Sequence, residues 1–155
     1  MSIIHPLKPI YNEESKVLIL GSFPSVISRK ENFYYANKTN RFWKVLEIIF
    51  NESITDKVEF LHKHNIALWD VIKSCDISSS KDSTIKNVIV NDISGLLKKT
   101  KITKIYINGK KAYELYLKYL KNSIDIEVVY LPSTSSANAT YNLVKLVNAY
   151  KVLTM

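Results

Sequence analysis

Cysteine, glycine and arginine are all scarce in this chain of 155 residues. The single cysteine, Cys75, excludes an intramolecular disulfide, a zinc site built from several thiolates and a cysteine-ligated iron–sulfur cluster. With only three glycines, neither a Walker loop nor the three-glycine dinucleotide fingerprint fits anywhere in the chain. These absences argue against ATP and NAD as ligands.

Long apolar segments are absent as well. No uninterrupted apolar run approaches the ~18 residues that span a bilayer, and residues 1–10 lack the apolar core of a signal peptide. We therefore expect an intracellular, cytoplasmic protein without a membrane partner. Because 46% of the residues are apolar, the chain can bury the core of one domain over residues 1–155, which we expect to be a monomer.

Basic residues outnumber acidic ones, with 22 Lys and Arg against 14 Asp and Glu and a net charge of +8. Such an excess makes polyanions such as nucleic acids candidate partners. Only Arg29 and Arg41 are arginines, however, and the lysines are scattered along the chain. The charge alone therefore fits a solvated, lysine-rich surface equally well.

Short apolar runs alternate with apolar residues at helical spacing. Runs rich in apolar or β-branched residues predict strands at residues 17–20, 66–69, 102–107 and 126–131. Helical spacing predicts helices near residues 40–50, 54–61, 93–97, 112–119 and 143–150. Thr55 is the expected cap of the second helix, and Ser136 or Asn138 of the last. The polar, serine-rich segment at residues 74–82 predicts a loop.

This alternation predicts an α/β fold, a three-layer αβα arrangement around a mainly parallel four-stranded sheet, because each parallel crossover requires a helix. Ligands bind such sheets beyond the carboxyl ends of the strands. Polar loops leave three of those ends, at residues 21–25, 108–109 and 132–138. We expect the three loops to converge on one site.

Two motif regions at these strand ends resemble the uracil-DNA glycosylase superfamily. The first is GSFPS at residues 21–25 with YYANKTNRFW at 34–43, similar to the Gly-x-x-Pro loop and Asn-Arg-Phe-Trp helix start of the mismatch-specific and deoxyinosine branches. The second is LPSTSSAN at residues 131–138, similar to the family's Pro-Ser loop, preceded by the similar turn NGKKAYE at 108–114. The matches follow the family's order and cover nearly the whole chain.

The deoxyinosine branch resembles this chain best. The shared features are the GSFPS form of the first loop, LWDV at residues 68–71, the loop with Asp82 and Ser83, and the LPSTS form of the second motif. The resemblance implies a glycosylase-like fold, damaged DNA as the partner, and hydrolytic removal of a deaminated base in base excision repair. Hypoxanthine is the first candidate base, and uracil and xanthine are the others.

The chemistry of such a reaction sets what the site must contain. Cleaving an N-glycosidic bond builds positive charge on the deoxyribose and negative charge on the departing base, so the enzyme must stabilise both and supply a water. Asparagine side chains and backbone donors can do this without a metal or an organic cofactor, and we expect neither. His5, His62 and His64 lack metal-ligand spacing, and we interpret them as surface histidines.

The resemblance assigns a role to Asn40. Other branches carry a water-positioning Asp or Asn where this chain has Phe23, and in the deoxyinosine branch the asparagine of the Asn-Arg-Phe-Trp segment is taken as its substitute. Asn40 is therefore the candidate catalytic residue, and the alternative is that it only caps the following helix.

Tyr35 stands where relatives place an aromatic residue that stacks on the extruded base. The alternative is that it fills the rim of the core. The residues expected to form the base pocket are Gly21, Ser22, Phe23, Tyr35, Asp82 and Ser83.

The hydroxyls and N–H groups of the second motif suit contacts with DNA phosphates. The residues expected to contact DNA are Ser25, Lys38, Arg41, Lys110, Ser133, Thr134 and Ser135. The alternatives are an ordinary solvated turn for the serine run and an acidic partner for Arg41. A denser lysine cluster at residues 98–104 precedes a strand, so we expect it at the opposite end of the sheet, in solvent.

Phe23 and Leu131 are apolar where other branches carry polar groups. They support a competing hypothesis, a non-catalytic nucleic-acid-binding module that retains the fold. Formation of an abasic product would discriminate between the two hypotheses.

Overall fold

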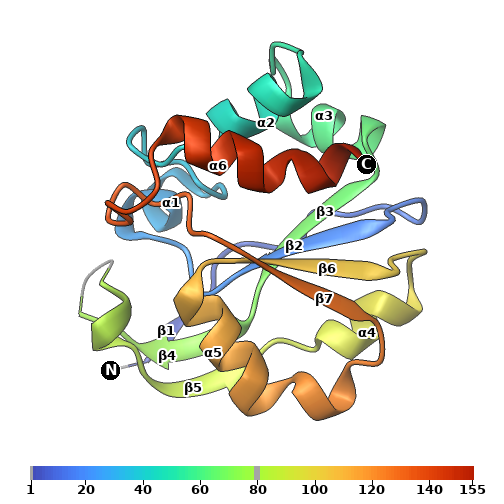
Figure 1. The fold of residues 1–155 in the computed structure, drawn as a ribbon. Coiled ribbons are helices and arrows are strands. Elements are labelled where there is room, and N and C mark those ends of the chain that lie inside the picture. The colour runs from blue at the N-terminus through green and yellow to red at the C-terminus, as the bar shows by residue number, and fades with distance from the viewer. Residues whose placement is uncertain (1, 79–80) are drawn as a thin grey trace.

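The computed structural model describes residues 2–78 and 81–155. At its centre lies a four-stranded parallel sheet with the strand order β3-β2-β6-β7 (Figure 1). The strands are β2 (Val17–Gly21), β3 (Ile66–Asp70), β6 (Lys104–Asn108) and β7 (Glu127–Leu131). The predicted α/β class and all four predicted strands are confirmed.

The two central strands are apolar on both faces because helices cover both. Leu18, Ile19 and Leu20 of β2 are fully buried, as are Ile105 and Ile107 of β6. A strand buried on both faces has no polar side, which is why these segments form continuous apolar runs in the sequence.

Helices form one layer on each face of the sheet. Figure 1 shows α2 (Phe42–Phe50), α3 (Lys57–Lys63) and α6 (Leu143–Tyr150) on one face, and α4 (Ile93–Lys98) and α5 (Lys110–Tyr119) on the other. Each helical layer packs on the sheet and forms its own hydrophobic core with it. Tyr150 of α6 is fully buried in the core beneath α2, α3 and α6, and its hydroxyl donates a hydrogen bond to the Pro132 carbonyl at 2.7 Å. The second motif is thereby tied to α6. Short 3₁₀ turns, η2 (Lys121–Ser123) and η3 (Lys151–Thr154), follow α5 and α6.

A second, antiparallel sheet was not expected from the sequence. It has the order β1-β4-β5 and comprises β1 (Ile3–Ile4), β4 (Ile72–Asp76) and β5 (Lys86–Val90). The predicted loop at residues 74–82 is therefore wrong at its start. Ile72 and Cys75 of β4 are buried while Lys73 is exposed, and irregular pairing with β5 breaks the two-residue alternation that would have marked the strand.

The predicted helix caps are also wrong, because α3 begins later than expected and α6 begins several residues after Ser136 and Asn138. Asp56, not Thr55, caps α3 by accepting from the Glu59 N–H at 3.1 Å. Asn142 caps α6 by accepting from the Lys145 N–H at 2.9 Å. A further short helix, α1 (Val26–Glu31), follows the first motif and is capped by the Ser25 hydroxyl.

No helix in the described part of the chain is long and apolar enough to cross a membrane.

Candidate functional site

The two motif regions meet at the carboxyl ends of β2, β6 and β7. The Arg41 N–H donates to the Thr134 carbonyl at 3.0 Å, and the Ser136 hydroxyl donates to the Thr39 hydroxyl at 3.2 Å. These contacts join segments that lie more than 90 residues apart in the sequence. The predicted convergence of the first and second motifs is therefore present in the structure.

Asn40 lies at the centre of this junction. Its Oδ1 accepts two hydrogen bonds, from the Phe42 N–H at 2.9 Å and from the Thr134 hydroxyl at 2.8 Å. Its amide NH₂ donates no hydrogen bond to any described residue. Asn40 thus makes the cap-like contact with α2 and still carries a free donor, so capping and catalysis are not exclusive.

Thr134 connects Asn40 to the end of β6. The Asn108 amide donates to the Thr134 hydroxyl at 3.1 Å, and the Thr134 N–H donates to the Asn108 Oδ1 at 3.2 Å. Thr134 is fully buried, so its hydroxyl and N–H are committed inside the protein. This structural role replaces the phosphate contact predicted for Thr134.

Replacing Thr134 with valine should lower the free energy of unfolding by about 2 kcal/mol, because the buried Asn108 amide loses its acceptor. It should also lower activity, because Asn40 loses one of its two anchors. Urea denaturation measures the first effect. Thr140→Val is the matched control, since Thr140 is an exposed residue of the same loop. Equal stability losses in the two variants would contradict the network.

Arg41 holds the second motif in place. Its guanidinium donates to the carbonyls of Ser135 at 2.6 Å, Thr134 at 3.2 Å and Asn138 at 3.4 Å, and also to that of Tyr141. The structure gives Arg41 neither the acidic partner nor the free guanidinium that the sequence-based alternatives require. Arg41 shapes the loop that the predicted site depends on.

Tyr35 lies beside Gly21 at the end of β2. Its ring stacks on Phe42 with centroids 4.0 Å apart, and its backbone adopts the left-handed region at φ 52°. Phe42 therefore covers one face of the ring that was predicted to stack on a base. The Tyr35 hydroxyl is buried and has no hydrogen-bond partner among the described residues.

Gly21 is required at its position because side chains crowd it. A Cβ there would lie 2.5 Å from Asp70 Oδ1 and 3.0 Å from the Tyr35 hydroxyl. The absence of a side chain at Gly21 thus lets Asp70 and Tyr35 converge at one point.

Residues 8–153 match the family model of the Uracil DNA glycosylase superfamily. The chain belongs to this superfamily.

Relatives and a solved structure support the same placement. A protein of Methanosarcina acetivorans named hypoxanthine DNA glycosylase is 35% identical over 139 residues, covering 86% of this chain and 87% of the relative. One of the same name from Methanosarcina barkeri is 33% identical, covering 84% and 85%. The solution NMR structure of a Methanosarcina acetivorans protein assigned to the uracil DNA glycosylases superposes with a TM-score of 0.79 at 32% identity, covering 96% and 97%.

In the first loop, Phe23 makes packing contacts within the protein, and Ser25 has a role other than the predicted DNA contact. Phe23 packs edge-on against the His5 ring at 5.7 Å, with the Arg29 guanidinium 5.4 Å from its centroid. Phe23 thus stabilises the loop by packing. Ser25 caps α1, so its hydroxyl accepts from the Ser28 N–H instead of standing free for DNA. Ser22 is half-buried and makes no side-chain hydrogen bond to a described residue.

The serines of the second motif mostly bond within their own loop. The Ser133 hydroxyl accepts from the Ser135 N–H at 3.1 Å, and the Ser135 hydroxyl accepts from the Ala137 N–H at 3.2 Å. The Ser135 N–H is therefore less available to a phosphate than the sequence predicts. Lys38 and Lys110, by contrast, are exposed at the same end of the sheet.

The predicted pocket residues Asp82 and Ser83 lie in the 3₁₀ turn η1 (Asp82–Thr84). The side chain of Asp82 lies outside the described part of the structure. Ser83 is exposed and forms no hydrogen bond with a described residue. Neither residue is brought into contact with Asn40 or Gly21 by a described interaction.

The interpretation of His5 as a surface histidine is wrong. Its side chain is 3% exposed, and its Nε2 lies 2.8 Å from Oδ2 of Asp70, which is also buried. The N-terminal segment runs antiparallel to β4, with the His5 N–H bonded to the Lys73 carbonyl, and this pairing carries His5 to the end of β3. The position of Asp70 at a strand end was a sequence signal for this site; nothing local marked His5.

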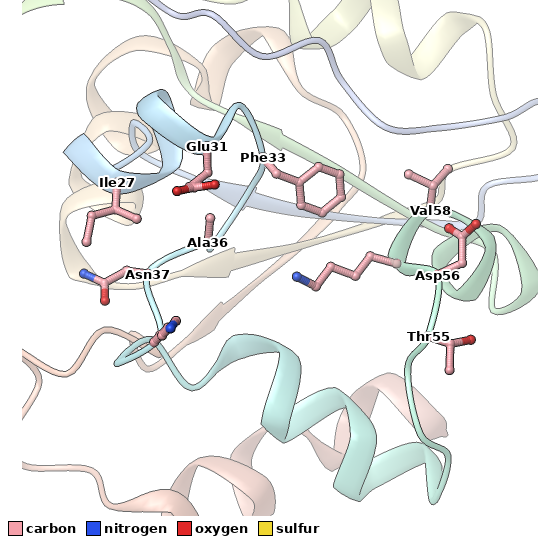
Figure 2. Close-up of a pocket in the computed structure, with 10 residues that line it drawn as sticks. Ile27, Glu31, Phe33, Ala36, Asn37, Thr55, Asp56 and Val58 are labelled. Carbon is pink, nitrogen blue, oxygen red and sulfur yellow. The ribbon is translucent and has the colours of Figure 1, made fainter.

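An open groove of about 780 Å³ flanks the first motif between α1 and α3 (Figure 2). Lys38 lies on its wall, and Lys57 places its ammonium 5.3 Å from the Trp43 ring and 5.5 Å from the Phe33 ring. Glu31 and Asp56 also line it. Its mixed charge does not favour a polyanion over other ligands, so the strand-end junction remains the candidate active site.

Proposed function

We propose that this protein is a monofunctional DNA glycosylase that flips a deaminated base, hypoxanthine first, and releases it by attack of water, leaving an abasic site. The observation that carries the proposal is the junction at Asn40. Its carbonyl is held by Phe42 and Thr134 while its NH₂ is free, at the point where both motifs of the superfamily meet. The names of the two relatives support hypoxanthine as the base.

The residues at the junction have different roles in the proposed reaction. Asn40 offers a positioned N–H donor, which can hold the attacking water or stabilise charge on the departing base. Because its orientation is set by two hydrogen bonds before substrate arrives, this donor needs no reorganisation during the reaction. Leu131 is buried and offers no polar group, so stabilisation of the leaving base falls to other groups near Gly21.

The experiment uses labelled duplexes that contain inosine, uracil, xanthine or a G·T mismatch. After incubation with the purified protein, alkali cleaves the strand at each abasic site. We expect product with inosine, and only after alkali, because a monofunctional enzyme does not nick the strand. Binding without product from any duplex would overturn the proposal and favour the non-catalytic module.

Lys38 and Lys110 are proposed to contact phosphates, since both are exposed at the strand ends and free of acidic partners among the described residues. Replacing Lys110 with alanine should weaken binding to all sequences and lower the slope of log affinity against log salt by about 1. Fluorescence anisotropy at several salt concentrations measures the slope. Lys98→Ala, in α4 near the opposite end of the sheet, should leave it unchanged; an equal effect of both variants would argue against a localised DNA surface.

A further inference from the structure

The end of β3 carries a hydrogen-bond acceptor that no described residue uses. Asp70 is 4% exposed, and among the described residues its Oδ2 alone has a hydrogen-bond partner, His5. Its Oδ1 receives no hydrogen bond from any described residue, although it lies at the crowded point beside Gly21. The unpartnered hydroxyl of Tyr35 borders the same point. A buried hydroxyl without a partner beside a carboxylate oxygen that no described residue uses indicates a polar ligand there.

His5 sets which oxygen of Asp70 is free. The Leu7 N–H donates to His5 Nδ1 at 3.1 Å. Because an N–H can only donate, Nδ1 is the unprotonated nitrogen, and the proton on Nε2 is donated to Asp70 Oδ2 at 2.8 Å. Phe23 packs against the imidazole from the side. His5 therefore occupies one carboxylate oxygen and leaves the other as an acceptor.

The Tyr35 hydroxyl is a donor at neutral pH. Burial raises its pKa well above the ordinary range, and the nearby Asp70 carboxylate raises it further, while the Asn108 side chain opposes the shift. A hydrogen-bond acceptor, Asp70 Oδ1, and a hydrogen-bond donor, the Tyr35 hydroxyl, therefore both border Gly21.

Resting on the proposed function, we propose that Asp70 and Tyr35 read the edge that deamination creates on a base. Adenine presents a ring nitrogen acceptor beside an amino donor, whereas hypoxanthine presents a ring N–H beside a carbonyl oxygen. Asp70 Oδ1 accepts from that N–H, and the Tyr35 hydroxyl donates to the carbonyl. Adenine would instead direct a nitrogen lone pair at the carboxylate, which is repulsive.

His5 contributes by exclusion as well as by orientation. Guanine shares the ring N–H and carbonyl of hypoxanthine but adds an amino group next to the N–H. With Asp70 Oδ2 occupied by His5, that amino group finds no acceptor and would be buried unpaired, at a cost. His5 is therefore a positioning residue that acts through Asp70.

The test measures the excision of hypoxanthine and of unsubstituted purine by the wild type and by Asp70→Asn. Unsubstituted purine lacks both the ring N–H and the carbonyl. The His5 N–H should draw the carbonyl of the substituted amide toward itself, leaving the NH₂ to face the base where the acceptor was. We expect the ratio of kcat/KM for hypoxanthine to that for purine to fall about 100-fold, the scale of a hydrogen bond to a charged group. Comparing ratios removes the different intrinsic reactivity of the two bases.

The outcomes separate the two proposals. An unchanged ratio, or equal losses on both bases, would overturn base reading by Asp70 while leaving the glycosylase assignment intact. Absence of hypoxanthine release by the wild type would overturn this inference, and absence of product from every duplex would overturn the proposed function as well. Asp92→Asn is the matched control, since Asp92 is an exposed cap of α4 and asparagine also caps helices.

A second pair of variants tests His5 and decides the matter if Asp70→Asn does not fold. His5→Leu leaves Asp70 without its donor, so the hypoxanthine-to-purine ratio should fall about 10-fold. His5→Gln can donate from its side-chain amide and should recover most of the ratio. A purely structural role for His5 would lower both activities together and leave the ratio unchanged in both variants.

Discussion

Replacing Asn40 with alanine is expected to lower the rate of base release by about 100- to 1000-fold, the usual effect of removing one preorganised donor from an active site. The same change should cost about 2 to 3 kcal/mol of folding free energy, because it removes the cap-like contact with α2 and leaves the buried Thr134 hydroxyl without its acceptor. Single-turnover assays on an inosine duplex measure the first quantity, and urea denaturation measures the second.

Asn40→Asp distinguishes catalysis from capping. Aspartate keeps an acceptor for the Phe42 N–H and the Thr134 hydroxyl but has no amide donor. If the free NH₂ carries the catalytic role, the aspartate variant should be nearly as stable as the wild type and nearly as inactive as the alanine variant. Full activity in Asn40→Ala would exclude Asn40 from the chemistry.

Replacing Arg41 with alanine should lower the free energy of unfolding by about 3 kcal/mol, because one charged donor group serves several loop carbonyls at once. The loop from Thr134 to Tyr141 would lose its common anchor. Since Thr134 orients Asn40, base release should fall to near background. Thermal or urea unfolding and the abasic-site assay measure the two effects.

Arg41→Lys should recover little of the loss. A lysine ammonium carries a single point of charge and cannot reproduce the planar set of guanidinium donors. The salt dependence of DNA binding separates this role from a phosphate contact. A variant with wild-type stability and a reduced salt slope would show that Arg41 binds DNA and does not mainly hold the loop.

Local patterns account for the elements that the sequence predicted well. Strands β2 and β6 are buried on both faces and end at turn-forming residues, so their apolar runs predicted strands. The antiparallel sheet was missed because β1 is two residues long and β4 pairs irregularly with β5. Neither strand has enough regular alternation to stand out from a polar loop.

Side-chain partners at the site were harder to predict. The motifs located Asn40 and the second loop, but a sequence motif does not show whether a hydroxyl faces solvent or the protein. Thr134 was predicted as a DNA contact on that basis and proved to be fully buried. Asn40 was weighed as a cap or a catalytic residue, and the structure shows a cap-like bond together with an unused amide donor.

From the sequence alone, the alternation of elements determined the fold class and the order of the motifs determined the superfamily, while the scarcity of cysteine and glycine excluded disulfides, thiolate metal sites and nucleotide-binding loops. These properties are local or compositional, so the sequence shows them without any information on tertiary contacts. Only the tertiary structure decided that Arg41 serves loop carbonyls and that His5 orients Asp70, because these contacts join residues 65 to 100 positions apart. Such pairs depend on how the strands are ordered in the sheets, which no single segment encodes.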